Sequence, residues 1–222
     1  MKQPAEAYYD KLSSVYDQAT SVENAWVAPA YMTERMKTFL RPDIDLLEIG
    51  IGTGQLSEEI LKHENNINIT GIDISSSMLD ICAKRFPTIK LIHGEVFDIV
   101  NNQKTSFQII AICGTLEFIE DYTHAFAACH SLLKPGGLLA FTYEPVIHNH
   151  PIQKEHKSLT VSSIESKYHV PDFYTYRRSP DEISLALEDN GFYALENSEF
   201  VPYSKQGIDV IYHCILAEKD EN

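Results

Sequence analysis

The sequence lacks the cysteine spacing that metal sites and disulfide frameworks usually show. Its four cysteines are Cys82, Cys113, Cys129 and Cys214, and no two of them are spaced as C-x-x-C. The first three lie in apolar segments, where a free cysteine packs as a small hydrophobic side chain. We therefore expect neither a zinc site nor disulfides, and we expect a reducing compartment.

A basic excess and a long apolar run are also missing. The 222-residue chain has 18 Lys and Arg against 32 Asp and Glu, a net charge of −14. Nucleic acid is not an expected partner, because its binding normally needs a basic surface that neutralises phosphates. No apolar run approaches the roughly 20 residues of a membrane-spanning helix. The first ten residues lack the apolar core of a secretory signal. We expect a cytoplasmic protein that is not bound to a membrane.

Hydrophobic residues are present in the proportion that a single domain over residues 1–222 needs. They make up 44% of the chain, enough for a full core. Short, mostly β-branched apolar runs alternate with helical patterns, which is typical of strands buried on both faces of a parallel sheet. The expected strands cover residues 44–49, 67–72, 89–93, 107–113 and 138–143.

Helical patterns and a hairpin complete the predicted fold. The expected helices cover residues 55–64, 75–86, 122–133 and 179–191. The last begins with Ser179 as N-cap, Pro180 at the first position and Glu182 in a capping box. Two strand-like runs then flank the turn-rich residues 202–207 and predict an antiparallel hairpin. We expect an α/β fold, with an open, mostly parallel sheet covered by helices on both faces.

Two segments lie outside this predicted core. Residues 1–40 are helical in pattern and rich in aromatic residues, whereas residues 144–178 are polar and irregular. The second segment is too long for a simple connection. Long insertions at the carboxyl end of a sheet usually carry binding functions. We therefore expect residues 1–40 to cap a site and residues 144–178 to form a lid over a substrate.

Three glycines at alternate positions follow the first expected strand. Gly50, Gly52 and Gly54 would let a ligand approach the backbone closely at the carboxyl end of that strand. A single glycine would suffice for a plain turn, so three favour a ligand site. A dinucleotide fingerprint has its last glycine where this chain has Gln55, and a phosphate loop would need a lysine that is absent here. The loop therefore favours another nucleotide-like ligand.

Acidic residues end the next two expected strands. Asp73 can accept hydrogen bonds from both ribose hydroxyls, or it can simply cap a helix. Glu95 can accept from an adenine amino group next to the backbone N–H of Val96, or it can be a solvated loop acid. Ile74 and Met78 would contact the ring, or they belong to the core. These positions together indicate a nucleoside pocket.

The order and spacing of five segments resemble the class I S-adenosylmethionine-dependent methyltransferases. The segments are LLEIGIGTG, GIDISSSML, GEVFDI, IIAICGTLEFIED and LLKPGGLLAFTYE. The lead segment YYDKLSSVYDQ resembles that of the small-molecule, ubiquinone-biosynthesis-like branch, in which it folds over the cofactor and would place Tyr16 there. The resemblance implies a Rossmann-like seven-stranded sheet and S-adenosylmethionine as cofactor.

The resemblance also implies roles for individual residues. Glu48 and the loop from Gly50 to Gly54 would hold the methionine part, with Glu48 close to its ammonium. Asp73 would bind the ribose, and Glu95 and Val96 the adenine. Cys113 and Gly114 would line the pocket after the fourth strand. Phe118 departs from the many relatives that have histidine there, which removes one polar group near the substrate.

The acceptor and the catalytic residues are less constrained. The expected reaction is direct displacement onto an oxygen or nitrogen of a small molecule, and the sequence specifies neither the acceptor nor an oligomeric state. Glu144 and His148, followed by Tyr176, are the candidate general bases. Arg177 and Arg178 either hold an anionic substrate or form salt bridges. The spacing of His148, His150 and His156 fits no metal site. The alternatives are a protein methyltransferase, a non-catalytic cofactor-binding or interaction domain, and a nicotinamide oxidoreductase.

Overall fold

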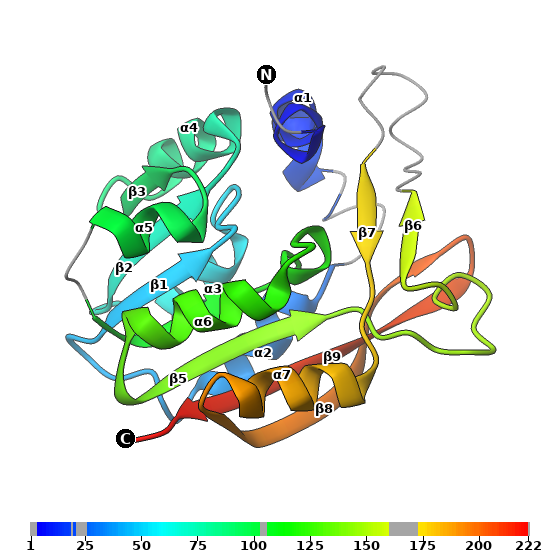
Figure 1. Ribbon diagram of the computed structural model, residues 1–222. Coiled ribbons are helices and arrows are strands. Elements are labelled where there is room, and N and C mark those ends of the chain that lie inside the picture. Colours follow the sequence, from blue (N-terminus) through cyan, green and yellow to red (C-terminus); the bar gives the residue numbers. More distant parts are fainter. Residues whose placement is uncertain (1–3, 19, 21–25, 103–105, 160–172, 222) are drawn as a thin grey trace.

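The computed structural model shows one central β-sheet with helices on both of its faces (Figure 1). It describes residues 4–18, 20, 26–102, 106–159 and 173–221. The sheet has seven strands in the order β3-β2-β1-β4-β5-β9-β8. All neighbouring pairs from β3 to β5 are parallel, whereas β9 is antiparallel to both β5 and β8. The predicted α/β fold with a C-terminal antiparallel hairpin is therefore confirmed.

The strands agree closely with the apolar runs in the sequence. Their bounds are β1 Asp45–Ile49, β2 Asn68–Asp73, β3 Lys90–His93, β4 Phe107–Ile112, β5 Leu133–Tyr143, β8 Phe192–Lys205 and β9 Ile208–Lys219. Strand order reverses between β1 and β4, because β2 and β3 follow on one side and β5 on the other. In open α/β sheets, ligands bind at the carboxyl ends of the strands at such a reversal.

Helices cover the two faces of the sheet in separate groups. On one face pack α2 (Ala28–Met36), α3 (Gln55–His63) and α4 (Ser76–Arg85), and on the other α5 (Val96–Asn102), α6 (Tyr122–Leu132) and α7 (Pro180–Asp189). Neighbouring residues of one strand serve opposite faces. Leu46 belongs to the first core and Leu47 to the second, and both are fully buried. This burial on both sides explains the continuous apolar character of β1.

Local signals explain where the helices begin. The Ser75 side chain accepts a hydrogen bond from the Met78 amide at the start of α4. The full capping box of α7 is present, with Ser179 and Glu182 accepting from each other's backbone N–H groups. These two helix starts were predicted correctly. The short helix α5 was missed, because its seven residues follow β3 too closely to show a helical period.

The hairpin and the start of β5 differ in detail from the prediction. The turn between β8 and β9 is confined to Gln206 and Gly207, both with positive φ, so the strand continues through Lys205. Residues 134–137, Lys-Pro-Gly-Gly, have a composition that is typical of a turn after α6. They belong instead to the beginning of β5, where the pairing register shifts between Phe107 and Ile109 of β4. This shift in register lies where a turn was expected.

Of the two segments expected outside the core, residues 1–40 place only α1 (Pro4–Gln18) at the carboxyl edge of the sheet, because α2 packs in the first core with Ala28, Met32 and Met36 fully buried. Helix α1 crosses above the ends of the strands (Figure 1). Residues 144–178 contain β6 (Lys157–Leu159) and β7 (Tyr174–Tyr176), which pair as a small antiparallel ribbon. Within the described chain, no helix has the length and apolar character to cross a membrane.

Candidate active site

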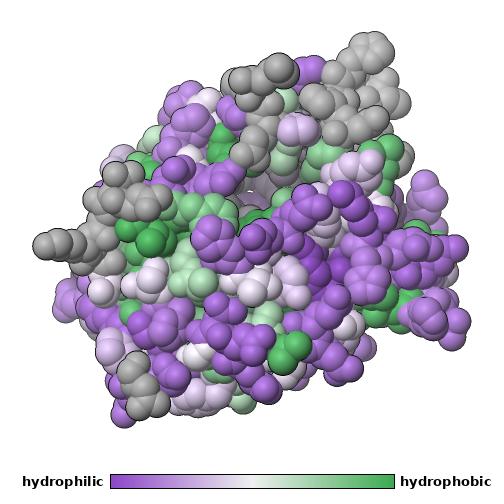
Figure 2. All heavy atoms as spheres, in the orientation of Figure 1, coloured by the Kyte–Doolittle hydropathy of each residue, from purple (hydrophilic) through white to green (hydrophobic). Residues whose placement is uncertain are grey.

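A cavity of about 540 Å³ lies where the strand order reverses, between α1 and the carboxyl ends of β1, β2 and β4. The molecular surface is hollowed in this region, with hydrophobic and hydrophilic side chains at its margin (Figure 2). Eleven of the twelve residues expected to bind the cofactor line the cavity. They are Tyr16, Glu48, Gly50, Gly52, Asp73, Ile74, Met78, Glu95, Val96, Cys113 and Gly114.

The glycine loop contributes open space and tight packing at different positions. Gly50, Gly52 and Gly54 all have positive φ, which favours glycine. A Cβ on Gly52 would meet no atom within 4 Å, so this backbone faces empty space. A Cβ on Gly54 would lie 2.8 Å from the Phe86 ring, and Gly54 is the N-cap of α3. Gly54 is therefore the one expected cofactor-binding residue that does not line the cavity.

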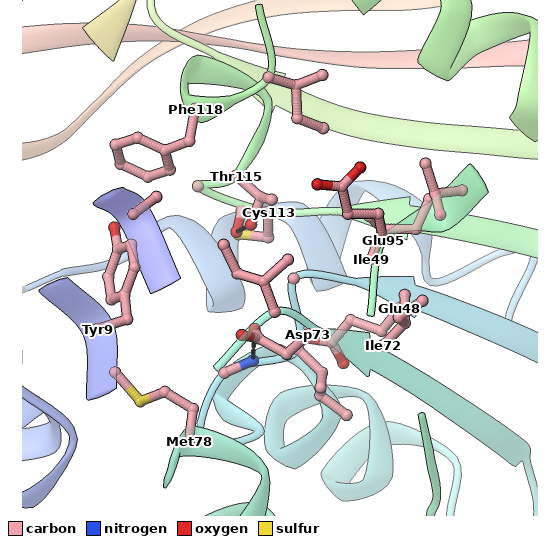
Figure 3. A pocket seen from close by; sticks show the side chains of 18 of the residues that line it. Tyr9, Glu48, Ile49, Ile72, Asp73, Met78, Glu95, Cys113, Thr115 and Phe118 are labelled. Carbon is pink, nitrogen blue, oxygen red and sulfur yellow. Dashed lines mark hydrogen bonds between the residues drawn. The ribbon is translucent and has the colours of Figure 1, made fainter. Parts of the chain in front are cut away.

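Asp73 is held in place by two backbone amides. Its Oδ2 accepts a hydrogen bond from the Gly52 N–H at 2.8 Å (Figure 3). Its Oδ1 accepts one from the Ser75 N–H at 2.8 Å. Burial raises the pKa of this carboxyl above its usual value, while the two amides oppose that shift. The carboxylate thus stands at a fixed orientation beside the glycine loop, where a ribose diol would meet it.

Glu48 is a carboxyl group buried at the floor of the cavity. It is 2% exposed, and Ser57 Oγ donates a 2.5 Å hydrogen bond to its Oε2. Burial raises its pKa to about 8, against the lowering effect of the Ser57 hydroxyl. A buried acid of this kind is stabilised when a cation comes next to it. The amino group of a bound amino acid would supply that cation.

Part of the cavity is lined by apolar side chains that would suit a heteroaromatic ring. Ile74, Met78, Glu95 and Val96 line it together with Phe97, which sequence reasoning did not identify. Phe97 stacks on His124, with ring centroids 4.4 Å apart. The sequence signal for Phe97 was weak, since α5 itself was not predicted.

The opposite end of the cavity carries a group of aromatic rings. Tyr9 from α1, Phe118 after β4 and Phe173 before β7 line it, with centroid distances of 5.5 to 6.3 Å between them. Figure 3 shows Phe118 and Tyr9 on the same side of the cavity. Burial raises the pKa of Tyr9, so its hydroxyl stays protonated at neutral pH. Phe173 lies in the 144–178 segment, in which sequence reasoning named Tyr176 and not Phe173.

Two aspartates of α1 fasten that helix over the cavity. Asp17 accepts hydrogen bonds from Thr53 Oγ1 at 2.6 Å and Gln55 Nε2 at 3.0 Å, both on the glycine loop and its helix. Asp10 accepts from Ser75 Oγ at 2.7 Å, at the start of α4. Sequence reasoning missed both aspartates, because their partners lie more than 30 residues away.

The candidate general bases Glu144 and His148 do not line the cavity. Glu144 is 5% exposed, and its Oε1 accepts a 2.6 Å hydrogen bond from Arg177 Nε. Burial raises the pKa of Glu144, and the Arg177 guanidinium opposes this. His148 lies in an exposed turn. Tyr176, the third candidate, does line the cavity.

Of the two arginines, Arg177 forms a salt bridge, as one of the two sequence interpretations held, although the pair is buried, whereas Arg178 contacts backbone carbonyls. Arg177 pairs with Glu144, and Arg178 donates to the carbonyls of Ile119 and Glu120. Neither arginine lines the cavity. Among the described residues, no three His, Cys, Asp or Glu side chains are grouped as metal ligands would be. All four cysteines are free thiols.

Comparisons with known proteins agree with this geometry. The family described as "Methyltransferase domain" matches residues 46–137. A malonyl-[acyl-carrier protein] O-methyltransferase from Halalkalibacterium halodurans is 27% identical over 148 residues, which are 64% of this chain and 55% of that protein. A demethylmenaquinone methyltransferase from Chlorobaculum parvum is 26% identical over 152 residues, 66% of this chain and 62% of that protein. The match thus spans less than two thirds of these relatives.

A solved structure extends the likeness to nearly the whole fold. A methyltransferase from Methanosarcina mazei superposes with a TM-score of 0.70 at 17% identity, covering 85% of this chain and 98% of that one. That protein is described as S-adenosylmethionine-dependent. The region that matches the family, residues 46–137, contains the glycine loop, Asp73, Glu95 and Cys113, which lie at or beside the cavity. Over residues 46–137 the chain matches the methyltransferase-domain family, and these relatives and the shared fold support its resemblance to the class I S-adenosylmethionine-dependent methyltransferases.

Proposed function

We propose that this protein transfers a methyl group from S-adenosylmethionine to an oxygen or nitrogen of a small-molecule acceptor. The observation that carries the proposal is the set of residues that line the cavity at the reversal of strand order. One part holds Glu48, Gly52 and Asp73, and the other holds the rings of Tyr9 and Phe118. The volume of about 540 Å³ lies in the range of small-molecule sites.

The residues present fit the cofactor part by part. Glu48 would hold the amino group, the open backbone at Gly52 the amino-acid part, and Asp73 the ribose hydroxyls. Ile74 and Phe97 would enclose the adenine. Bound S-adenosylmethionine supplies an electrophilic methyl group on a positively charged sulfur. Cys113 and Gly114 would lie beside that group, at the end of β4.

The protein's contribution to the reaction is mainly alignment and exclusion of water. Direct displacement requires the acceptor atom in line with the bond that breaks. Tyr9, Phe118 and Phe173 would hold the acceptor, while α1 closes the cavity above it. In this proposal residues 1–40 are a cap and residues 144–178 a substrate lid within one domain. Glu144 is left with a structural role.

The named relatives do not fix the acceptor, because one name specifies malonyl-[acyl-carrier protein] and the other demethylmenaquinone. The ubiquinone-biosynthesis-like branch remains our assignment for the N-terminal segment. A protein acceptor fits less well, since α1 and β7 enclose the aromatic end. A non-catalytic binding domain would retain the cofactor residues and lack turnover.

Calorimetric titration with S-adenosylmethionine and S-adenosylhomocysteine tests the cofactor, with NAD as the negative control. We expect micromolar binding of both sulfur compounds and at least a tenfold loss in Asp73→Ala. Asp80→Ala, an exposed site on α4, is the matched control and should bind normally. Tight binding of NAD alone would contradict the proposal. Cofactor binding without methyl transfer to any acceptor in a metabolite screen would favour the binding-domain alternative.

A further inference from the structure

We infer that the methyl acceptor is an amine nitrogen carried on an apolar, ring-sized body, and that carboxylate acceptors are disfavoured. This inference rests on the proposed function and narrows it to one acceptor class. It follows from two features of the acceptor end of the cavity: its aromatic wall and the charges that line the cavity. The aromatic wall is separate from the residues assigned to the adenosine part of the cofactor, whereas Asp73 and Glu95 among the acids also serve that part.

The aromatic wall is suited to a flat apolar body with a positive charge. Tyr9, Phe118 and Phe173 come from three separate segments and meet with tilted or edge-on rings. Ring faces attract cations within about 6 Å, by more when the site is desolvated. The neighbouring rings of Tyr174 and Tyr176 already contact a cation of the protein itself. Lys157 Nζ lies 4.3 Å from the centroid of Tyr174 and 4.9 Å from that of Tyr176.

The charged groups that line the cavity are carboxyl groups. Glu48, Asp73, Glu95, Glu120 and Asp121 all contribute to its wall, whereas the described lining contains no Lys, Arg or His. Lys157, which is not part of the described lining, is already paired with Glu120 at 3.3 Å. Among the described residues, the lining offers an acceptor carboxylate no guanidinium or ammonium to pair with. An amine would enter this negative field favourably, helped by the overall charge of −14.

The reaction of an amine also suits this environment electrostatically. The amine enters as an ammonium ion and first loses one proton to solvent water. The lone pair of the resulting neutral nitrogen then forms the new N–C bond while the C–S bond breaks and leaves its electron pair on sulfur. Positive charge therefore passes from sulfur to nitrogen inside the same cavity. A primary or secondary amine then releases a proton to water, and a tertiary amine keeps the charge. The aromatic and acidic walls stabilise the cation before and after transfer.

A nitrogen acceptor needs no general base in the cavity once its lone pair is free. A phenol or alcohol acceptor would need one, and the tyrosines buried in the cavity are poor candidates. Burial raises the pKa values of Tyr9 and Tyr16, so both phenols stay protonated. Glu144 is engaged with Arg177 outside the cavity. These side chains thus agree with an acceptor that attacks the methyl group with its own lone pair and needs no base from the protein.

Three probes with one shared body test this inference on the full-length protein. They are 2-phenylethylamine, 2-phenylethanol and 3-phenylpropionate, titrated into protein saturated with S-adenosylhomocysteine. We expect the amine to bind at least tenfold more tightly than the carboxylate. With S-adenosylmethionine, mass spectrometry should show methyl transfer to the amine only. Tighter binding or methylation of the carboxylate or alcohol would overturn the inference, and so would failure of all three probes to bind.

The cofactor titration separates this outcome from failure of the proposed function. If S-adenosylhomocysteine binds and the amine does not, only the acceptor class is wrong. If S-adenosylhomocysteine does not bind, the proposed function itself is wrong, and the acceptor inference falls with it.

A pair of aromatic variants localises the effect within the cavity. Phe118→Leu should lower the ratio of amine to alcohol affinity by about 3- to 10-fold, because it removes one cation-binding ring. Phe97→Leu changes the same residue type at the opposite, adenine end of the cavity and should leave that ratio unchanged. Thermal unfolding establishes that both variants fold. An equal change in the ratio for both variants, or none for Phe118→Leu, would contradict the assignment of the aromatic end.

Discussion

The amide N–H of Gly52 donates a 2.8 Å hydrogen bond to Oδ2 of Asp73, joining the loop after β1 to the end of β2. The two residues belong to neighbouring parallel strands, and Glu48 of β1 pairs with Gly71 of β2 in the same register. The bond therefore holds the glycine loop and the carboxylate in a fixed relation without any ligand. A site that is already ordered loses less entropy when its ligand binds.

Substitution of Gly52 should impair cofactor binding more than folding. Gly52→Ala adds a Cβ that meets no protein atom within 4 Å and extends into the cavity. The positive φ of Gly52 makes alanine unfavourable by about 1–2 kcal/mol. We expect an affinity for S-adenosylmethionine at least tenfold weaker by calorimetry, with a modest loss of stability.

Gly207→Ala is the matched control for that substitution. Gly207 also has positive φ and open space around its Cα, but it lies in the turn between β8 and β9. It should lose a similar amount of stability and bind the cofactor normally. Equal affinities in the two variants would show that Gly52 does not face the ligand.

Cofactor binding should release a proton from Glu48. Its pKa of about 8 leaves the carboxyl mostly protonated at pH 7, and an ammonium group beside it would favour ionisation. Affinity should therefore rise between pH 6 and 8. Calorimetry at pH 7 in phosphate and in Tris, which differ in ionisation enthalpy, should show release of a substantial fraction of one proton. In Glu48→Gln that buffer dependence should vanish, and its persistence would assign the proton to another group.

The same carboxyl should make the unliganded protein less stable as pH rises. A carboxyl whose pKa is raised on folding binds more protons in the folded state than in the unfolded one. Stability contributed by protonated Glu48 is therefore present below pH 4.5 and lost progressively up to its folded pKa of about 8. Urea unfolding at pH 5.5 and 8 should show this decline, and Glu48→Gln should reduce it. A wild-type protein equally stable at both pH values would argue against the raised pKa.

Loss of the Asp17 contacts should loosen α1 over the cavity. Asp17 accepts hydrogen bonds from Thr53 and Gln55 and is partly exposed. Asp17→Ala removes both, and hydrogen bonds of this kind contribute about 0.5–1.5 kcal/mol each. We expect about 3- to 10-fold faster dissociation of S-adenosylhomocysteine in stopped-flow measurements. In Asp80→Ala, a change at an exposed residue of α4, S-adenosylhomocysteine should dissociate at the wild-type rate. Identical dissociation rates in the two variants would exclude this role for Asp17.

The ion pair between Arg177 and Glu144 should matter for folding and not for chemistry. Arg177→Ala leaves a buried carboxylate without its partner, which destabilises by about 3–5 kcal/mol. The double variant Arg177→Met with Glu144→Gln should recover much of that loss. In stopped-flow single-turnover assays of protein that remains folded, Glu144→Gln should retain methyl transfer within a few-fold. A loss of a hundredfold or more would restore Glu144 as a general base.

Helix α7 and strands β1 and β2 illustrate which features could be predicted from the sequence. The Ser179 cap, Pro180 and the apolar spacing of α7 are all contained in one short stretch, and α7 was predicted within a few residues. The extended runs of β1 and β2 were predicted as closely, because burial on both faces leaves a continuous apolar signature. Gly54 was assigned to the ligand although it packs against Phe86, a contact across 32 positions that no local pattern reveals.

The sequence by itself determined the strands, the capped helices, the glycine loop and the acids that end β2 and β3, because periodicity, caps and turns depend on neighbouring residues. Only the tertiary structure decided that Tyr9, Phe118 and Phe173 share one end of the cavity. It alone removed Glu144 from the site by pairing it with Arg177. Those relations depend on how distant segments pack, and long-range contacts leave no period in the chain.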